Sequence, residues 1–353
     1  MAVSLVYFTR LEASGRKGRT RPLAAFGDRN AVVTASSSDT TGRLAPELSV
    51  VVIVVAGAAT LARCLDALAG QAHAAAMDTI VVFDEGDRDV RSLGLRFAPV
   101  QWLAVPTGTT VPHMRARGLA RARAPIVALL EDDCLVEPGW SAAVQAAHAT
   151  RDAAIGGAVE PGPYRRGLDW AVYFCEYGRF MAPFRPGADV LRALAGNHVT
   201  YKREALAATD LSGADGFVDV FVHAAWQRAG VPLRVDETLV VRNVNRWSPA
   251  DVTVGPFHHG RAFAAQRARG QSLLERVARC LAASALPAVL AGRIIRDAAS
   301  TQRFVWRLVP AFPWIVLFVT SWSIGEAVGY LSGPGQSPAY WRPRARRPAK
   351  GTT

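Results

Sequence analysis

The 353-residue chain has few cysteines and too few acidic residues to balance its basic ones. Its four cysteines are far apart and form no C-x-x-C pair. That argues against a zinc site or a disulfide framework and fits a reducing cytosol. Forty-one Lys and Arg stand against 29 Asp and Glu, which gives a formal net charge of +12. So basic a balance indicates an anionic partner: a nucleic acid, a membrane surface or a phosphorylated substrate.

Three other signals are absent. No long apolar segment follows the basic run at 16–21, which argues against a secretory signal. We therefore interpret residues 1–46 as a disordered basic leader. No glycine-rich phosphate loop stands at 56–59, which argues against a nucleotidyltransferase. No DNA-reading helix motif is found and the cations are spread among apolar segments, so we expect no nucleic-acid partner.

Apolar β-branched runs, in contrast, are plentiful. The run at 48–55 is typical of a strand that is buried on both faces of a parallel sheet. Further strands and intervening helices follow it, and this alternation predicts an α/β fold with a parallel sheet. The other predicted strands are 79–83, 100–105, 126–130, 155–159, 196–201 and 239–241, and the predicted helices are 60–71, 114–123, 141–150 and 219–229.

An acidic triplet, Glu131-Asp132-Asp133, comes directly after the strand at 126–130. Three adjacent carboxylates repel one another, and a divalent cation among them relieves that repulsion. Oxygen ligands of this kind suit Mg²⁺ or Mn²⁺. Ligands of open α/β sheets bind at the carboxyl ends of the strands, so the triplet predicts both a metal and the position of the site.

The last third of the chain is apolar. Residues 280–292 are uncharged but too few to cross a bilayer, whereas 308–325 are just long enough. Cations lie both before and after these segments, and the positive-inside rule places both groups in the cytoplasm. We therefore expect a hairpin or re-entrant membrane anchor; the alternative is a buried helical hairpin of a soluble domain. The expected division is a catalytic domain at 47–255, a basic amphipathic helical region at 256–303, a membrane segment at 304–333 and a basic disordered tail at 334–353.

Several motifs together resemble those of the family 2 glycosyltransferases. They are Asp84 after the second strand, the stretch 115–119, the stretch 126–134 and Pro138-Gly139-Trp140. The resemblance spans roughly residues 48 to 265 and implies the GT-A fold, a Rossmann-like and mostly parallel sheet flanked by helices. His259-Gly260-Arg261 and the stretch 325–330 are similar to those of membrane-associated members, so apolar C-terminal helices complete the expected architecture.

The resemblance also implies roles for individual residues on the donor side. Asp133 would hold the metal, Mg²⁺ or Mn²⁺, that bridges the two phosphates of the sugar donor. Asp132 would lie near the ribose, and Asp84 would accept a hydrogen bond from the nucleotide base. Arg115, near the start of a basic helix, would contact phosphate. The alternative for Arg115 is an ordinary solvated helix face, since basic residues continue along that helix.

On the acceptor side, Asp219 matches the catalytic base of inverting members, which removes the proton of the attacking hydroxyl. A carboxylate at a helix start also serves as a plain N-cap, and Asp215 is the second candidate for the base. Asn197 and His198 align with the strand beside the acceptor. Asn243-x-x-Arg246-Trp247 is similar to the Gln-x-x-Arg-Trp signature of processive synthases, but Asn replaces Gln and we assign it no role.

The sequence therefore predicts an inverting, metal-dependent glycosyltransferase at the cytoplasmic side of the cell membrane. Its donor would be a nucleotide-sugar, with a UDP-sugar expected, and its acceptor a lipid-linked or polysaccharide glycan of the cell envelope. The chain departs from the family pattern in four places: the turn after the first strand reads Val54-Val55-Ala56-Gly57, Phe83 replaces an Asp, Ala116 the usual Asn and Val218 the usual Glu. Val218 and the altered turn motivate the alternative hypothesis, a catalytically inactive membrane-bound protein that keeps the fold for binding or scaffolding.

Overall fold

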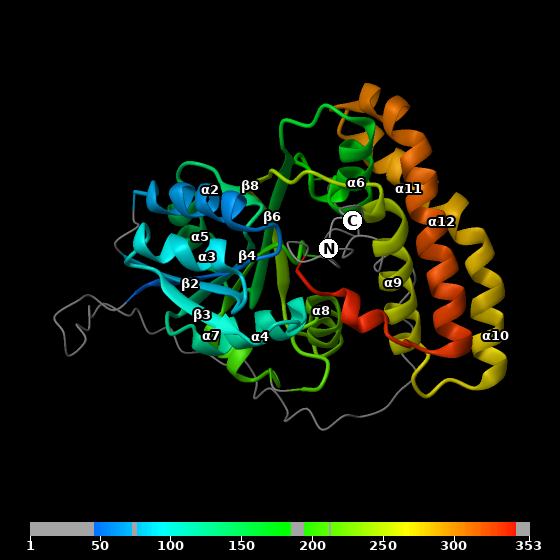
Figure 1. Ribbon diagram of the computed structural model, residues 1–353, viewed down its shortest axis with the longest axis horizontal. Coiled ribbons are helices and arrows are strands. Elements are labelled where there is room, and N and C mark those ends of the chain that lie inside the picture. Colours follow the sequence, from blue (N-terminus) through cyan, green and yellow to red (C-terminus); the bar gives the residue numbers. More distant parts are fainter. Residues whose placement is uncertain (1–45, 73–75, 185–193, 212, 344–353) are drawn as a thin grey trace.

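The computed structural model describes residues 46–72, 76–184, 194–211 and 213–343 (Figure 1). Eight strands form one mixed sheet in the order β3-β2-β1-β4-β7-β6-β8-β5. The strands are β1 (Leu48–Ile53), β2 (Met77–Asp84), β3 (Gln101–Val105), β4 (Ile126–Glu131), β5 (Cys134–Val136), β6 (Ala154–Pro161), β7 (His198–Lys202) and β8 (Leu233–Asn243). The helices of the sheet domain are α2 (Ala58–Ala69), α3 (Arg88–Ser92), α4 (Val111–Arg121), α5 (Trp140–Ala147), α6 (Gly167–Glu176), α7 (Arg203–Ala207) and α8 (Asp219–Arg228).

The first half of the sheet is parallel, as the apolar runs predict. Strand β1 pairs in parallel with β2 and β4, and β2 pairs in parallel with β3. All six residues of β1 are buried because helices cover both of its faces. Val50 and Val52 pack with the apolar side of α2, whereas Val51 and Ile53 pack with that of α4. A near-continuous apolar strand is therefore required at this position.

The direction of the strands reverses at β7. Strand β7 is antiparallel to β4, so its first residues lie at the edge where β1, β2 and β4 end. Residues that follow the parallel strands and residues that precede β7 thus gather at one edge of the sheet. This topology brings together segments near residues 84, 132 and 197, which are far apart in the sequence.

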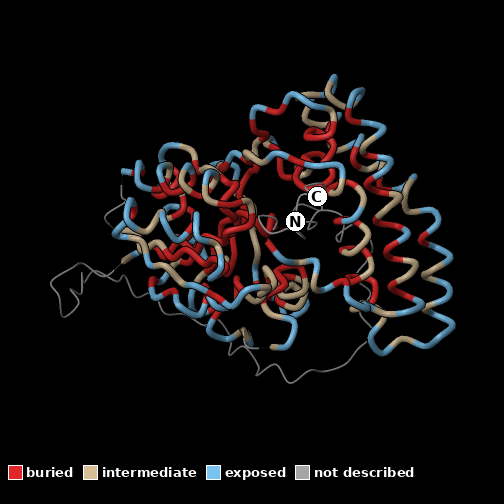
Figure 2. The backbone as a smooth tube through the Cα atoms, in the orientation of Figure 1, coloured by how far each residue is buried: buried red, intermediate tan, exposed pale blue. Residues whose placement is uncertain are grey.

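The C-terminal helices form a separate layer beside the sheet domain (Figure 1). They are α9 (Ala250–Arg267), α10 (Leu273–Ala282), α11 (Leu286–Ser300) and α12 (Leu308–Ser332). Segments Leu273–Ser300 and Val305–Ser332 are each long and apolar enough to cross a membrane. The first segment is longer than the apolar run at 280–292, because α10 and α11 extend through charged residues on either side of that run. Figure 2 shows many exposed residues along these helices. Leu274, Leu281 and Val309 are among the exposed large apolar side chains.

Helix α12 packs against α9 through glycines and one buried ion pair. A Cβ atom on Gly325 would lie 2.1 Å from the carbonyl oxygen of Phe257, and one on Gly260 would lie 2.3 Å from that of Trp322. The absence of side chains therefore lets the two helix backbones approach closely. Beside this contact, Arg267 and Glu326 form a buried ion pair with an N–O distance of 2.7 Å. The two motifs that resemble membrane-associated family members thus face each other across one interface.

Residues 333–343 follow α12 and return across α9 to the sheet domain; we call them the C-terminal strap. Residues Ser337–Tyr340 form the short helix η7. The sequence predicts disorder for 334–353, but 334–343 are folded against α9 and α4, and the rest of that range lies outside the described residues. The predicted leader at 1–46 also lies outside them, except for residue 46.

Candidate active site

Asp132 organises the loop after β1. Its carboxylate accepts hydrogen bonds from the backbone N–H groups of Val55 (2.8 Å), Ala56 (3.0 Å) and Gly57 (2.9 Å). Burial and the charge of Asp133 raise the pKa of Asp132 to about 8, against the lowering effect of these N–H bonds. The carboxylate thus lies at the predicted edge of the sheet, where its oxygens hold the loop. A contact with ribose stays a prediction.

Asp133 is enclosed by the segment that follows β8. Its Oδ2 accepts a hydrogen bond from the side-chain amide of Asn245 at 2.6 Å, and its backbone oxygen accepts one from the N–H of Val244 at 2.8 Å. Sequence reasoning missed Asn245. The signal was available in Asn243-x-x-Arg246-Trp247, the stretch to which no role was assigned, because Asn245 lies within it.

The carboxylates at this edge suit a metal that shares its coordination with a substrate. Within the described parts of the chain, no group of three or more His, Cys, Asp or Glu side chains is placed to hold a metal ion. Asp133 with the adjacent Asp132 provides one or two protein oxygens. Mg²⁺ is commonly bound by one or two carboxylates plus substrate phosphates rather than by a complete protein cage. The residues therefore fit a cation whose remaining ligands come from a diphosphate and water.

A buried ion-pair network lies beside the acidic pair. Arg115 donates through Nη1 to Asp219 Oδ1 at 2.7 Å and through Nη2 to Glu131 Oε1 at 2.9 Å. All three side chains are at most 4% exposed. Burial acts to lower the pKa of Arg115, but the charges of Asp219 and Glu131 outweigh it and raise the pKa. Arg115 is therefore not on a solvated face, and Glu131, for which sequence reasoning found no role, belongs to this network.

The Asp219 side chain does not cap helix α8, and its role as a base stays a prediction. The N-cap of α8 is Val218, and the Asp219 carboxylate bonds to Arg115 instead of capping the helix. Its second oxygen, Oδ2, lies against Gly196, where a Cβ atom would be only 2.2 Å away. Asp219 Oδ2 is buried and has no hydrogen-bond partner among the described residues. The alternative base, Asp215, is at the surface and paired with Arg269 at 2.9 Å.

Asn197 and His198 occupy different environments because neighbouring residues of an extended segment point in opposite directions. Asn197 is close to the acidic edge: its backbone oxygen accepts a hydrogen bond from the N–H of Glu131 at 3.3 Å. His198 is fully buried, and its Nε2 accepts a hydrogen bond from the indole N–H of Trp140 at 2.9 Å. Burial lowers the pKa of His198 to about 3. The geometry thus gives His198 a place in the core, and an acceptor contact stays a prediction for both residues.

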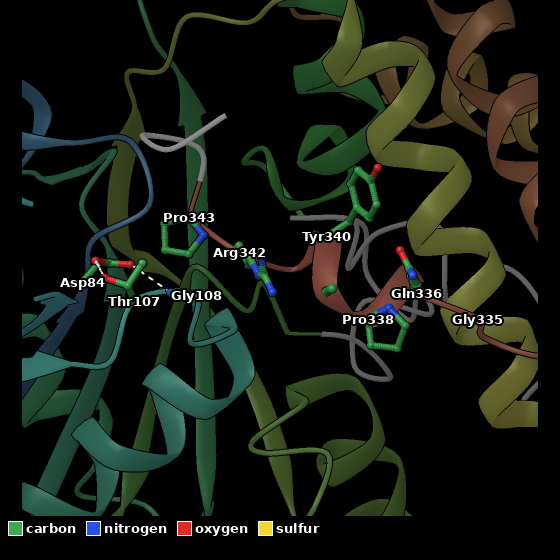
Figure 3. A pocket seen from close by; sticks show the side chains of 10 residues that line it. Asp84, Thr107, Gly108, Gly335, Gln336, Pro338, Tyr340, Arg342 and Pro343 are labelled. Carbon is green, nitrogen blue, oxygen red and sulfur yellow. Dashed lines mark hydrogen bonds between the residues drawn. The ribbon is translucent and has the colours of Figure 1, made fainter. Parts of the chain in front are cut away.

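Asp84 lies at one end of a cavity of about 690 Å³. The hydroxyl of Thr107 donates to its Oδ1 at 2.8 Å and the N–H of Gly108 donates to its Oδ2 at 3.1 Å. Figure 3 shows these three residues at one side and Tyr340, Pro338, Gln336 and Gly335 of the C-terminal strap at the other, with Arg342 and Pro343 of the strap between them. The carboxylate that is expected to read the nucleotide base therefore faces an open volume.

Comparison with known proteins agrees with this description. No curated protein sequence matches the chain. Among solved structures, it is similar to the mannosyltransferase PcManGT from Pyrobaculum calidifontis, determined in complex with GDP-Man and Mn²⁺. The TM-score is 0.52 and the identity 18%, over 82% of this chain and 88% of that one.

That likeness, together with the mixed eight-stranded sheet, confirms the predicted GT-A-like α/β fold. The model of the family described as "Glycosyltransferase like family 2" matches residues 46–248, more than half of the chain. The chain therefore belongs to the family 2 glycosyltransferases.

Proposed function

We propose that the protein is an inverting, metal-dependent glycosyltransferase that moves a sugar from a nucleotide-sugar to a hydroxyl of a lipid-linked or polysaccharide acceptor. The observation that carries the proposal is the Arg115–Asp219–Glu131 network beside the Asp132-Asp133 pair, at one edge of the sheet. It combines a buried carboxylate, one oxygen of which has no hydrogen-bond partner among the described residues, a cation that fixes the other oxygen, and an acidic pair suited to a metal.

Electrostatics supports metal dependence. Glu131, Asp132, Asp133 and Asp219 carry four negative charges when all are ionised, against one positive charge on Arg115, so the edge has a formal charge of −3, or −2 while Asp132 keeps its proton. A diphosphate would be repelled by this edge without a counter-cation. Asp133 would hold that ion, which would neutralise the charge that develops on the leaving diphosphate. The neighbour's complex with GDP-Man and Mn²⁺ supports both a nucleotide-sugar and a divalent cation.

Asp219 is the proposed general base. Arg115 holds Oδ1, which leaves Oδ2 to accept the proton of the acceptor hydroxyl. The acceptor oxygen forms a bond to the anomeric carbon as the bond from that carbon to the diphosphate oxygen breaks. A single displacement of this kind inverts the anomeric configuration. Arg115 is thereby proposed as a positioning residue for the base, rather than a phosphate contact.

The C-terminal helices support an association with the membrane. One side of α12 is buried against α9, but the hairpin exposes large apolar side chains such as Leu274, Leu281 and Val309. Such a surface suits the acyl boundary of a bilayer. We propose that this hairpin, formed by α10, α11 and α12, docks the catalytic domain on the cytoplasmic face of the membrane. Flotation with vesicles of anionic lipid checks this: Leu274→Glu with Leu281→Glu should reduce the bound fraction, and unchanged flotation would refute it.

Sugar transfer can be tested with the full-length protein in lipid nanodiscs. The reaction contains Mn²⁺, a set of UDP- and GDP-sugars and a polyprenyl phosphate acceptor. We expect one donor to be consumed, EDTA to stop the reaction, and the product to have the inverted configuration. Asp133→Asn should abolish metal-dependent turnover. Asp219→Asn should lower kcat by about 10²- to 10⁴-fold, the usual contribution of a general base.

Asp215→Asn is the matched control, since it removes a surface carboxylate and should leave turnover unchanged. If no donor is consumed, or if Asp133→Asn and Asp219→Asn turn over like wild type, the proposal is wrong. A product that retains the donor's configuration would contradict the single displacement.

A further inference from the structure

Most of the wall of the Asp84 cavity comes from the far end of the chain. Seven of its ten lining residues belong to the stretch 335–343 of the C-terminal strap, and only Asp84, Thr107 and Gly108 come from the sheet domain. Figure 3 shows the strap running from Gly335 toward Asp84, with Arg342 between Gly108 and Tyr340 and with Pro343 beside Thr107. The family match ends at residue 248, so it does not include this wall.

The strap is fixed at both of its sides. On α9, the imidazole of His258 stacks on the ring of Tyr340 at a centroid distance of 3.4 Å, and its Nδ1 lies 3.0 Å from the hydroxyl of Ser337. On α4, the backbone oxygen of Trp341 accepts a hydrogen bond at 2.7 Å from the N–H of Val111, the first residue of that helix. The wall of the cavity is therefore a packed element.

Arg342 brings a positive charge to the end of the cavity where Asp84 lies. A Cβ atom on Gly108 would lie 3.5 Å from the guanidinium carbon of Arg342, and the N–H of the same glycine donates to Asp84. The side chain is exposed and lines the cavity. Within the part of the chain that the structure describes, no hydrogen bond or ion pair is formed by its guanidinium group. A planar cation at this place is available to a ligand.

We propose that the C-terminal strap completes the nucleotide pocket and that Arg342 contacts the nucleotide of the donor. This inference rests on the proposed function, because it assumes a nucleotide-sugar donor with its base at Asp84. A guanidinium group either stacks on an aromatic ring or pairs with phosphate oxygens. A nucleotide carries both groups. Arg342 thereby adds a donor contact from a segment outside the region of the family match.

The test measures nucleotide binding rather than transfer. Calorimetric titrations of the full-length protein with Mn²⁺ use uridine, UMP and UDP, and the matching guanosine series. We expect Arg342→Gln to raise the Kd of the bound nucleoside diphosphate at least tenfold, or about 1.4 kcal/mol. Arg203→Gln is the matched control. Arg203 is exposed after β7, which runs antiparallel to β4, so it lies at the opposite edge of the sheet and binding should not change.

Arg342→Lys identifies the contacted group. Rescue by Lys, with a loss in Arg342→Gln that grows with the number of phosphates, assigns the contact to phosphate. An equal loss for nucleoside and diphosphate, without rescue, assigns it to stacking on the base. In steady-state transfer, Arg342→Gln should raise the KM for the donor more than it lowers kcat, whereas a folding defect would lower the active fraction and leave KM unchanged.

The two proposals fail in different ways. If Arg342→Gln binds the diphosphate as tightly as wild type, the inference about the strap is wrong, while the proposed transferase is untouched. If wild type binds a nucleoside diphosphate through Arg342 but transfers no sugar, the inference stands and the transferase proposal fails. If wild type binds no nucleotide, both are wrong.

Discussion

Arg115 shows how one residue links stability to the proposed chemistry. Its guanidinium group is buried between two carboxylates, so three charges have been removed from water and stabilise one another. Removing charges from water costs several kcal/mol per ion, and only good hydrogen-bond geometry offsets that cost. The residue could be picked out from the sequence but its environment could not, because a basic helix looks the same whether an arginine faces solvent or the core.

Replacing Arg115 should therefore destabilise the fold. Arg115→Gln removes the cation that pairs with buried Glu131 and Asp219, and we expect unfolding to become easier by about 3–5 kcal/mol. Arg117→Gln is the control on the same helix, because Arg117 is exposed and its loss should change stability by less than about 0.5 kcal/mol. Denaturant unfolding of both variants gives the comparison. Equal stability of the two would show that the network contributes nothing to folding.

At the scale of elements, the contact between α9 and α12 depends on glycine. Gly260, Gly325 and Gly329 each face backbone atoms of the other helix at distances that a side chain would not tolerate. Helix α12 carries part of the exposed apolar surface and, at its end, the C-terminal strap. The spacing of these two helices therefore sets the position of the cavity wall relative to Asp84.

A methyl group on Gly325 should disturb this spacing. In Gly325→Ala the new Cβ meets the carbonyl oxygen of Phe257, so the helices must separate, at an expected cost of about 1–3 kcal/mol. Gly292→Ala is the matched control: a Cβ atom on this helical glycine would have no neighbour within 4 Å, and alanine should stabilise α11 by up to about 1 kcal/mol. The melting temperatures of the two variants in nanodiscs measure this difference in stability. Equal melting temperatures would mean that the close contact has no energetic weight.

Which elements could be predicted depends on how each is buried. Strands β1 and β4 were predictable because burial on both faces demands continuous apolar residues. Strand β8 spans Leu233–Asn243, yet only 239–241 are predicted, because its first half carries Arg234, Asp236 and Glu237. The C-terminal strap has no periodic pattern at all, and only the tertiary structure brings it to Asp84.

The candidate site was predictable in part. The acidic triplet was evident in the sequence, whereas the contact of Asn245 with Asp133 depends on the path of the chain after β8.

At the scale of the whole molecule, buried histidines make stability depend on pH. Burial lowers the pKa of His198 to about 3 and those of His148 and His223 to about 4. In the unfolded chain a histidine binds a proton near pH 6.5, so the unfolded state takes up more protons than the folded state below that pH. Their contribution to stability is therefore complete above pH 6.5 and is lost as the pH falls toward 4. Asp132, with its pKa raised to about 8, binds a proton in the folded state and acts in the opposite direction.

The variant His198→Gln isolates one histidine from these opposing effects. The amide oxygen of the new glutamine can still accept a hydrogen bond from the indole N–H of Trp140. Between pH 6.5 and 4.5 we expect wild type to lose stability faster than the variant by about 1.4 kcal/mol per pH unit. Urea unfolding at several pH values measures both slopes. Parallel slopes would show that His198 is protonated as easily in the folded protein as in the unfolded chain.

The order of segments along the chain becomes an order in time during synthesis. The carboxylates at the sheet edge lie within the first 219 residues, but most of the wall opposite Asp84 is supplied by residues 335–343, which a ribosome adds only after the whole apolar hairpin. A nascent chain can thus fold its sheet and assemble its acidic residues while the cavity is still open on one side. The cavity closes only when α12 has found α9, so a chain whose hairpin is misplaced would keep its carboxylates but lack this wall.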